Sequence, residues 1–392
     1  MNIAKSSKFN IKIDYDKSHG CYLYDKITEK EYLDFFGMYA SLPLGYNHEI
    51  FQTKEFVNEI LRVSKFKVNN CEFVSDESLE FDHLFSEYCA RGLFKKFHYA
   101  CTGALAIEAA IKTAIEYKKA KSPRILSFHN SFHGINSYGG FVTSRFPGAD
   151  IRLNGFPEIF STKIDCDLEQ VKEKLLEENI TCILMEPIQC SAGDIHHDLL
   201  FFEGLRALCN EFDVPLIFDE IQIGFGGTGK LWYYEHLTIT PDIVVFGKKT
   251  QLSGIMVKEE FATLLSPERG VRLEVTWDGD VVDMVRCKHI IKHYQNNKIL
   301  ESVLESGKYL MSKLKEIEAL ENVRGIGLIV GFDLKNNEKR DKLMILLYNS
   351  GLICNSTGEK SIRLRPALNI GKKELDKGII LIKEACREIG ET

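Results

Sequence analysis

Short apolar runs alternate with stretches of helical periodicity through the middle of the chain. Four such runs lie at 124–128, 181–185, 214–218 and 243–246. Runs of this kind are typical of strands that are buried on both faces. Their alternation with helices predicts an α/β fold, in which helices cover both faces of a mostly parallel sheet.

The pattern changes from about residue 280 onward. We expect long amphipathic helices around 284–294 and 299–317, strand-like pieces at 325–334 and 351–354, and a final helix at about 372–389. We therefore predict two domains. The large domain covers 51–280, and a small α+β domain combines both chain ends, 1–50 and 281–392.

Composition narrows the class of protein. The chain has 392 residues, 44% of them hydrophobic and 27% charged, which is ordinary globular usage. A net charge of -6 offers no basic face for nucleic acid or an anionic membrane. The start lacks the apolar core of a signal peptide, and eleven scattered cysteines without paired spacing favour free thiols in a reducing compartment. We expect a cytoplasmic protein.

Two polar residues directly follow neighbouring strands of the predicted sheet. Asp219 comes directly after the run at 214–218, and Lys248 comes two residues after the run at 243–246. The carboxyl ends of parallel strands meet at one crevice, so a carboxylate and an amine should lie together there. Pyridoxal 5'-phosphate needs this pair, because the amine forms a Schiff base with its aldehyde and the carboxylate keeps its pyridine nitrogen protonated.

A phosphate site is expected at Thr102, Gly103 and Ala104, where a strand leads into a helix of apolar spacing. The free amides at a helix start can bind a phosphate dianion, and glycine permits its close approach. An ordinary capped helix is the alternative.

Two segments carry a resemblance to a known family. The sequences FDEIQIGFGGTG at 218–229 and PDIVVFGKKT at 241–250 closely resemble the signature of class III pyridoxal-phosphate aminotransferases, and most closely the lysine 6-aminotransferase group. The resemblance extends from Gly20 to Pro366. It implies fold type I and transfer of an amino group, in this group a terminal one, from an amine donor to a 2-oxo acid. It also implies a homodimer with active sites at the subunit interface.

The resemblance implies roles for residues around the cofactor. The Schiff-base residue would be Lys248 rather than Lys249, because the family's lysine follows a small residue and Gly247 fills that position. Further implied contacts are the phosphate loop at Thr102, Gly103 and Ala104, stacking by Phe132, a ring-hydroxyl contact from Gln222, a supporting carboxylate at Glu186, and a phosphate contact from Thr276 of the neighbouring subunit.

Substrate recognition departs from the family. Arg365 matches the arginine that binds the α-carboxylate of the 2-oxo acid. Ser191 replaces the family's switch glutamate, which neutralises that arginine while a terminal amine is bound, and Ile135 replaces the arginine that lysine-specific relatives use for the far carboxylate. Losing a bidentate anchor should weaken binding at least about tenfold. We therefore expect an unpaired Arg365, an apolar far pocket at Ile135 and Tyr39, and a less charged amine as donor.

Several alternatives stay open. Arg145 or Arg152 could replace the missing far anchor, and Glu274 could pair with Arg365. Another reaction of the same cofactor, such as decarboxylation or amino-group migration, would also keep Asp219 and Lys248.

Two motifs predict nothing further. His129 and His133 have neither an intervening glutamate nor a third partner, so no metal is expected. The GxGxxG match at 224–229 lies deep in the chain rather than in a first βα turn, so no dinucleotide site is expected.

Overall fold

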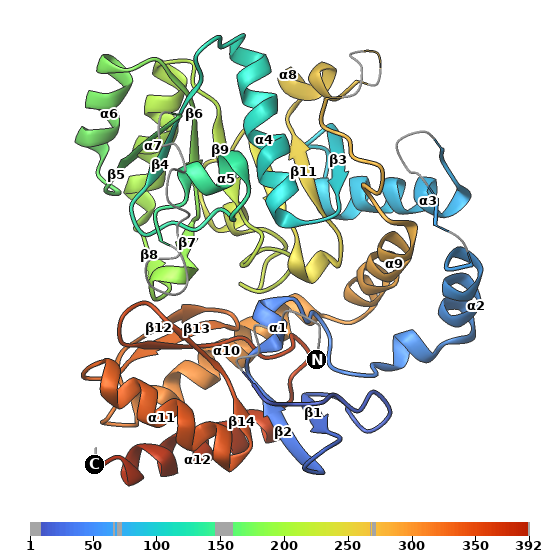
Figure 1. The fold of residues 1–392 in the computed structure, drawn as a ribbon, viewed down its shortest axis with the longest axis vertical. Coiled ribbons are helices and arrows are strands. Elements are labelled where there is room, and N and C mark those ends of the chain that lie inside the picture. Colours follow the sequence, from blue (N-terminus) through green and yellow to red (C-terminus); the bar gives the residue numbers. More distant parts are fainter. Residues whose placement is uncertain are drawn as a thin grey trace.

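A seven-stranded sheet forms the centre of the larger of two lobes, in the order β3-β11-β10-β9-β6-β4-β5 (Figure 1). The computed structural model describes residues 9–65, 67–68, 73–145, 160–266, 268 and 272–390. The strands are β3 (Lys96–Ala100), β4 (Arg124–Phe128), β5 (Ser161–Ile164), β6 (Ile180–Met185), β9 (Leu216–Asp219), β10 (Ile243–Phe246) and β11 (Ser253–Val257). Only β11 runs against the others, because it pairs antiparallel with both β10 and β3. The predicted α/β fold with a mostly parallel sheet is confirmed.

Helices cover both faces of this sheet, which explains why its central strands are apolar throughout. On β6, Cys182 and Leu184 pack in one cluster with α4 (Gly103–Lys118). Ile183 and Met185 point the opposite way, into a second cluster with α7 (Leu199–Glu211). Burial on both faces removes the apolar and polar alternation of a half-exposed strand. Two further helices of this lobe are α5 (Ser137–Val142) and α6 (Leu168–Glu177).

Both chain ends build the smaller lobe (Figure 1). One sheet joins β1 (Tyr22–Asp25) and β2 (Lys30–Asp34) from the start of the chain to β14 (Leu352–Ile353). A second has the order β12-β13-β16-β15. Its strands are β12 (Glu321–Ile326), β13 (Ile329–Asp333), β15 (Asn355–Thr357) and β16 (Ser361–Leu364). The helices of this lobe are α10 (Ile299–Lys315), α11 (Asn337–Ser350) and α12 (Lys372–Glu388), and α9 (Val281–Asn296) precedes them along the chain. This agrees with the expected small α+β part.

One stretch differs from the expected pattern. The strand-like piece at 325–334 is the second half of a hairpin, in which β12 starts earlier and turns at Gly327 before β13. Gly327 has φ +56°, and a Cβ there would stand 2.7 Å from the Gly227 oxygen. The turn therefore depends on a contact with a distant segment, which local periodicity does not reveal.

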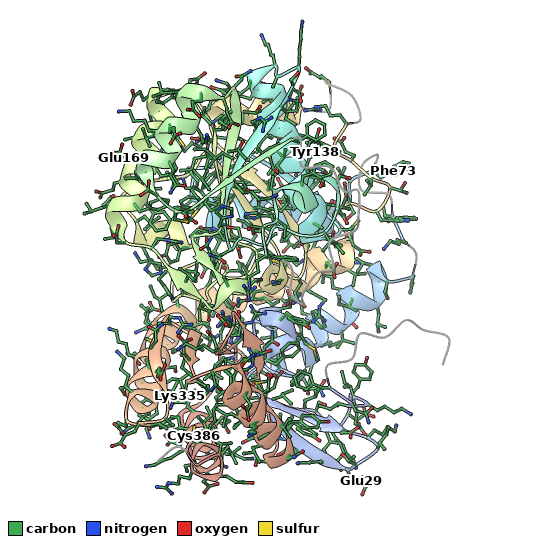
Figure 2. The ribbon with its side chains drawn as sticks, turned by 60° about the vertical axis from the view of Figure 1, so that its left-hand side comes forward. Glu29, Phe73, Tyr138, Glu169, Lys335 and Cys386 are labelled. Carbon is green, nitrogen blue, oxygen red and sulfur yellow. The ribbon has the colours of Figure 1, made fainter. Side chains whose placement is uncertain are left out.

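Helices α2 (Lys54–Val63) and α3 (Asp76–Phe85) extend along one side of the larger lobe, beside α9. Phe73, next to α3, lies at the edge of that lobe with 65% of its surface exposed (Figure 2). No helix within the described ranges combines the length and the apolar character that crossing a bilayer requires.

Candidate active site

Asp219 and Lys248 lie at the same edge of the large sheet, as their positions predict. Strands β9 and β10 are parallel neighbours, with Val245 opposite Asp219. Lys248 follows three residues later in a short 3₁₀ turn, Lys248–Thr250, which contacts the Gly37–Ala40 turn of the smaller lobe. The candidate site therefore lies at the junction of the two lobes.

Lys248 is the accessible amine of this edge. Its side chain is half-buried and makes no hydrogen bond within the part of the chain that the structure describes. Burial, followed by the positive charge of Arg363, lowers the pKa of Lys248 to about 8. The preceding Gly247 must be small, because a Cβ there would approach Ser253 Oγ to 2.8 Å. A considerable fraction of neutral amine near pH 8 makes Lys248 a competent nucleophile and base.

Lys249 occupies a different environment. It is buried, and its Nζ donates to the backbone oxygen of Gln222 at 2.8 Å. Burial and the charges of Arg365 and Lys248 lower the pKa of Lys249 to about 7. Its amine is thus held against a loop backbone, so the geometry favours Lys248 as the reactive lysine.

Asp219 is buried and held in place by His133. The Nδ1 atom of His133 lies 2.9 Å from Asp219 Oδ2, and Asp219 Oδ1 accepts from the backbone amide of Ile221 at 3.1 Å. From the sequence, His133 was weighed only as a metal ligand, a role that was not expected, so this contact was missed. The signal was its position between Phe132 and Gly134, but only the fold brings that segment beside β9.

A second buried carboxylate supports the same segment. Glu186, just after β6, accepts a hydrogen bond from the backbone amide of Phe132 at 2.8 Å. Burial and the negative charge of Asp219 raise the pKa of Glu186 well above its ordinary value. Phe132 itself is partly buried at this edge, with its backbone fixed by Glu186.

The start of α4 meets the other two segments. Thr102 caps the helix, with its Oγ1 accepting from the Leu105 amide at 3.3 Å. A Cβ on Gly103 would approach Ile221 Cδ1 to 2.9 Å, and one on Gly134 would stand 3.4 Å from the Cβ of Ala104. The helix start, the segment of Phe132 and the turn after Asp219 therefore form one continuous surface.

Thr276 is exposed on a loop beside this helix start. The loop is fastened there by Asp278, whose Oδ1 accepts from the amide of Cys101 at 3.3 Å. In the same loop, Glu274 accepts from the amides of Arg272 and Leu273 rather than from Arg365.

Arg365 is paired, contrary to the expectation from the loss of the switch glutamate. Its Nη2 donates to Asp194 Oδ1 at 2.5 Å, and both side chains are almost fully buried. Its Nη1 donates to the backbone oxygens of Val330 and Leu364. Asp194 lies three residues beyond Ser191, and sequence inspection of position 191 alone could not find it.

Arg363 provides a second guanidinium beside Arg365, and the two residues together form one wall of the site. Its Nη1 donates to the backbone oxygen of Cys190 at 2.9 Å, and its other nitrogens have no hydrogen bond within the described ranges. Its charge is the strongest one that lowers the pKa of Lys248. Arg363 and Arg365 are two positions apart in an extended segment, so alternation along it directs them to the same side.

The other expected substrate residues differ in exposure. Ile135 and Tyr39 are 69% and 49% exposed. Ser191 is half-buried, and its backbone oxygen accepts from Arg145 Nε at 3.0 Å. Of the two arginines that could replace the far anchor, Arg145 therefore lies beside Ser191, whereas Arg152 lies outside the described residues.

The architecture is that of a fold type I pyridoxal-phosphate enzyme. It combines a large α/β lobe, a small lobe from both chain ends, and a lysine opposite a buried aspartate. The family model for aminotransferase class-III matches residues 3–386, so the chain belongs to that family.

Similar proteins agree with this membership. The chain is 32% identical to an L-lysine-epsilon aminotransferase of Mycobacterium bovis, covering 96% of this chain and 92% of the relative. It is 32% identical to an acetylornithine aminotransferase of Prochlorococcus marinus, covering 95% and 91%. A solved lysine aminotransferase from M. tuberculosis, in its internal aldimine form, superposes with a TM-score of 0.93 at 30% identity, covering 98% of this chain and 97% of that one.

These findings identify a pyridoxal-phosphate-dependent aminotransferase. They give no support to a decarboxylase or an aminomutase. The residues present also fit the cofactor. Gln222 Oε1 is buried and has no hydrogen-bond partner among the described residues. This oxygen can therefore accept a hydrogen bond from a hydroxyl group of the cofactor. The free amides at the start of α4 suit a phosphate, and Asp219 suits a pyridinium.

Proposed function

We propose that this aminotransferase moves a terminal amino group from an amine or amino acid to a 2-oxo acid. The observation that carries the proposal is the pairing of Lys248 and Asp219 at one sheet edge, in a chain whose relatives include L-lysine-epsilon and acetylornithine aminotransferases. Bound pyridoxal phosphate supplies an electron sink that stabilises a carbanion at the donor carbon.

The chain's own groups have separate tasks. Lys248 attaches the cofactor and moves a proton at the reacting carbon, a task supported by its lowered pKa. Asp219, oriented by His133, keeps the pyridine nitrogen protonated, and Gln222 binds the ring hydroxyl. The remaining contacts proposed for the cofactor are stacking by Phe132 and phosphate binding by Thr102, Gly103, Ala104 and Thr276.

The donor is proposed to be less charged than lysine. Ile135 and Tyr39 offer apolar surface to its far end. Arg363, beside Arg365 and its ion-pair partner Asp194, forms the carboxylate-binding wall for the 2-oxo acid. Loss of a far guanidinium removes about 1.5–3 kcal/mol of charge-assisted binding, so lysine and 2-oxoglutarate should be poor substrates.

A spectroscopic titration tests the function. The purified enzyme with bound cofactor is mixed with lysine, ornithine, glutamate and 1,5-diaminopentane in turn, and its visible absorption is followed. We expect one donor to bleach the band, and a 2-oxo acid to restore it. A band that no donor changes, in a protein with cofactor bound, would contradict transamination of these amines.

The replacement of Ile135 and Ser191 has its own test. The variant carrying Ile135→Arg and Ser191→Glu should gain activity toward lysine relative to 1,5-diaminopentane. Ile135→Lys with Ser191→Gln serves as the comparison, because it provides a weaker anchor without the carboxylate. Unchanged preference in both variants would remove these positions from donor recognition.

We further propose a cytoplasmic homodimer with active sites at the subunit interface. Exposed apolar side chains support an interface, among them Phe73, Val74, Val275 and Trp277. The division into a large domain at 51–280 and a small domain from 1–50 and 281–392 is proposed on the grouping of the sheets. Sedimentation should give twice the chain mass of 44.7 kDa.

A further inference from the structure

The turn between two short strands, β7 (Ile188–Gln189) and β8 (Ile195–His196), brings a carboxylate to Arg365. Asp194 ends this turn with none of its surface exposed. Its Oδ1 accepts from Arg365 Nη2 at 2.5 Å. This contact forms the buried ion pair of the carboxylate-binding wall.

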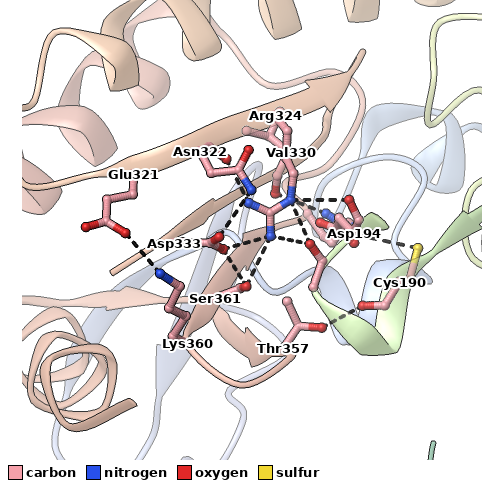
Figure 3. Close-up of polar contacts among 12 residues, drawn as sticks. Cys190, Asp194, Glu321, Asn322, Arg324, Val330, Asp333, Thr357, Lys360 and Ser361 are labelled. Atoms are coloured by element: carbon pink, nitrogen blue, oxygen red, sulfur yellow. Dashed lines mark hydrogen bonds and ion pairs between the residues drawn. The ribbon is translucent and has the colours of Figure 1, made fainter. Parts of the chain in front are cut away.

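The backbone that carries Asp194 is fastened to the smaller lobe (Figure 3). Arg324, on β12, donates from Nε to the oxygens of Gly193 at 2.8 Å and Asp194 at 3.3 Å. The same guanidinium is held by Asp333 at 2.8 Å and by Ser361 at 3.1 Å. Gly193 has φ +110°, and a Cβ there would come within 3.0 Å of Ser361 Oγ. The turn therefore has little freedom to move.

The start of the turn is fastened in the same way. The backbone oxygen of Cys190 accepts from Thr357 Oγ1 at 2.6 Å and from Arg363 Nη1 at 2.9 Å. The backbone oxygen of Ser191 accepts from the amide of Gly358 at 3.2 Å. The start of the turn is thus bonded to β15, β16 and the loop between them, and its end is bonded to Arg324 of β12.

The space around the Asp194 carboxylate is equally restricted. A Cβ on Gly331, in β13, would stand 2.9 Å from Asp194 Oδ2. An aspartate has only a short side chain, so it cannot leave Arg365 without movement of the turn that Arg324 holds. Moving it would also leave the guanidinium buried without a counter-charge.

We propose that Asp194 is a fixed counter-ion of Arg365 that sets how strongly the active site attracts carboxylates. It is a positioning residue, and the proposal rests on the proposed function. A movable glutamate would release Arg365 in one half of the cycle. The fixed pair instead keeps the charge of Arg365 neutralised in both halves of the catalytic cycle. Donors without a carboxylate can therefore enter as readily as charged ones. The uncompensated positive charge of the wall comes from Arg363.

The test is the binding of malonate, a carboxylate that can neither donate nor accept an amino group. Asp194→Asn keeps the shape and one hydrogen-bond acceptor but removes the charge. We expect malonate to bind the holoenzyme roughly tenfold more tightly, measured through the cofactor absorbance, because a free guanidinium adds a charge-assisted hydrogen bond. The Michaelis constant for a donor that lacks a carboxylate, such as 1,5-diaminopentane, should stay unchanged. The double variant with Arg365→Met should return malonate binding to the original value.

Asp333→Asn is the matched control. Asp333 is a buried carboxylate of the same cluster, but it pairs with Arg324 and Ser361 rather than with Arg365. Its loss should change malonate binding less than Asp194→Asn does, because it loosens the support of Arg324 but leaves the charge of Asp194 beside Arg365. Equal effects of Asp194→Asn and Asp333→Asn would show that the pair only stabilises the fold, and would overturn the proposal.

Gly331→Ala provides a second route if Asp194→Asn does not fold. It displaces the carboxylate and leaves its charge intact, so malonate binding should tighten by a smaller factor. Unchanged binding in a folded Gly331→Ala protein would overturn the proposal. Failure of the wild-type enzyme to turn over any donor would contradict the proposed function instead, because malonate binding can be measured without turnover.

Discussion

At the scale of single residues, two adjacent lysines have different environments. Lys248 faces the junction of the lobes, whereas Lys249 is bonded to Gln222. The family resemblance implied Lys248, because the family's lysine follows a small residue such as Gly247, and the hydrogen bond of Lys249 supplies an independent reason. The two residues therefore form a natural matched pair for substitution.

Replacing each lysine should separate chemistry from stability. Lys248→Ala is expected to abolish transamination and the visible band of the covalently attached cofactor. Lys249→Met should keep the band but lose about 1–3 kcal/mol of unfolding free energy, because the Gln222 oxygen is left unsatisfied. Absorption spectra and denaturant unfolding check these outcomes. A band that survives in Lys248→Ala and disappears in Lys249→Met would reverse the assignment.

The lowered pKa of Lys248 predicts a pH dependence. Only the neutral amine attacks an aldehyde, and its fraction rises as the pH increases through the pKa. In protein stripped of cofactor, the rate of cofactor attachment should therefore rise up to about pH 8 and level off above it. Stopped-flow absorbance measures this rate. A rate that keeps rising toward about pH 10.4, the ordinary lysine pKa, would contradict the burial argument.

His133 should act through Asp219. His133→Leu removes the hydrogen bond to a charged carboxylate, worth about 1.5–3 kcal/mol, so kcat should fall about 10- to 100-fold. His133→Asn, which can still donate near the Nδ1 position, should recover most of the rate. Steady-state kinetics on the best donor distinguish the two, and equal losses would leave His133 with a packing role only.

At the scale of elements, two backbone features shape the site. The turn at Gly37–Ala40 has positive φ at all four residues, including +59° at Tyr39. Asp34 holds it through the amides of Phe36 and Gly37 at 2.7 and 2.8 Å. Left-handed residues with a Cβ cost roughly 1–2 kcal/mol each, so this turn exists only because its surroundings fix it.

The start of α4 depends on close packing against the turn after Asp219. Gly103→Ala should weaken cofactor binding and cost about 1–3 kcal/mol, because its Cβ would overlap Ile221 Cδ1. The double variant with Ile221→Val lacks that atom and should recover much of the loss. Cofactor titration and thermal unfolding measure both effects. No recovery in the double variant would mean that the phosphate, rather than Ile221, requires glycine.

At the scale of the whole molecule, the site needs both lobes and, we propose, both subunits. On one side of the molecule, Lys288 of α9 joins α2 and α3 by pairing with Glu59 and Glu80, the latter at 2.9 Å. Arg324 ties the other side through the turn of Asp194. Chemistry at Lys248 is thus sensitive to groups remote from it in sequence.

Mixing two inactive proteins tests the shared site. Lys248→Ala and Thr276→Val dimers are dissociated, mixed in equal amounts and reassembled. If Thr276 acts on the partner's cofactor, each mixed dimer has one intact site, and about a quarter of the wild-type activity should return. If Thr276 acts within its own subunit, no mixed dimer has an intact site, and activity stays low.

Local sequence pattern was enough to locate the large sheet and to place Asp219 and Lys248 at one edge of it, whereas the cofactor was predicted from the family resemblance. Buried parallel strands are apolar without interruption, and the residues that follow them must meet at one edge, so the positions of Asp219 and Lys248 could be predicted before the fold was known. The agreement of the resemblance with the family match extends this to the class of enzyme.

Which charges are paired, in contrast, depends on the folded chain. His133 is separated from Asp219, and Asp194 from Arg365, by long stretches of chain, and no local periodicity links them. The prediction of an unpaired Arg365 was wrong for this reason, because it weighed only position 191 and Glu274. A buried charge needs a partner in space rather than a partner at a given position in the sequence.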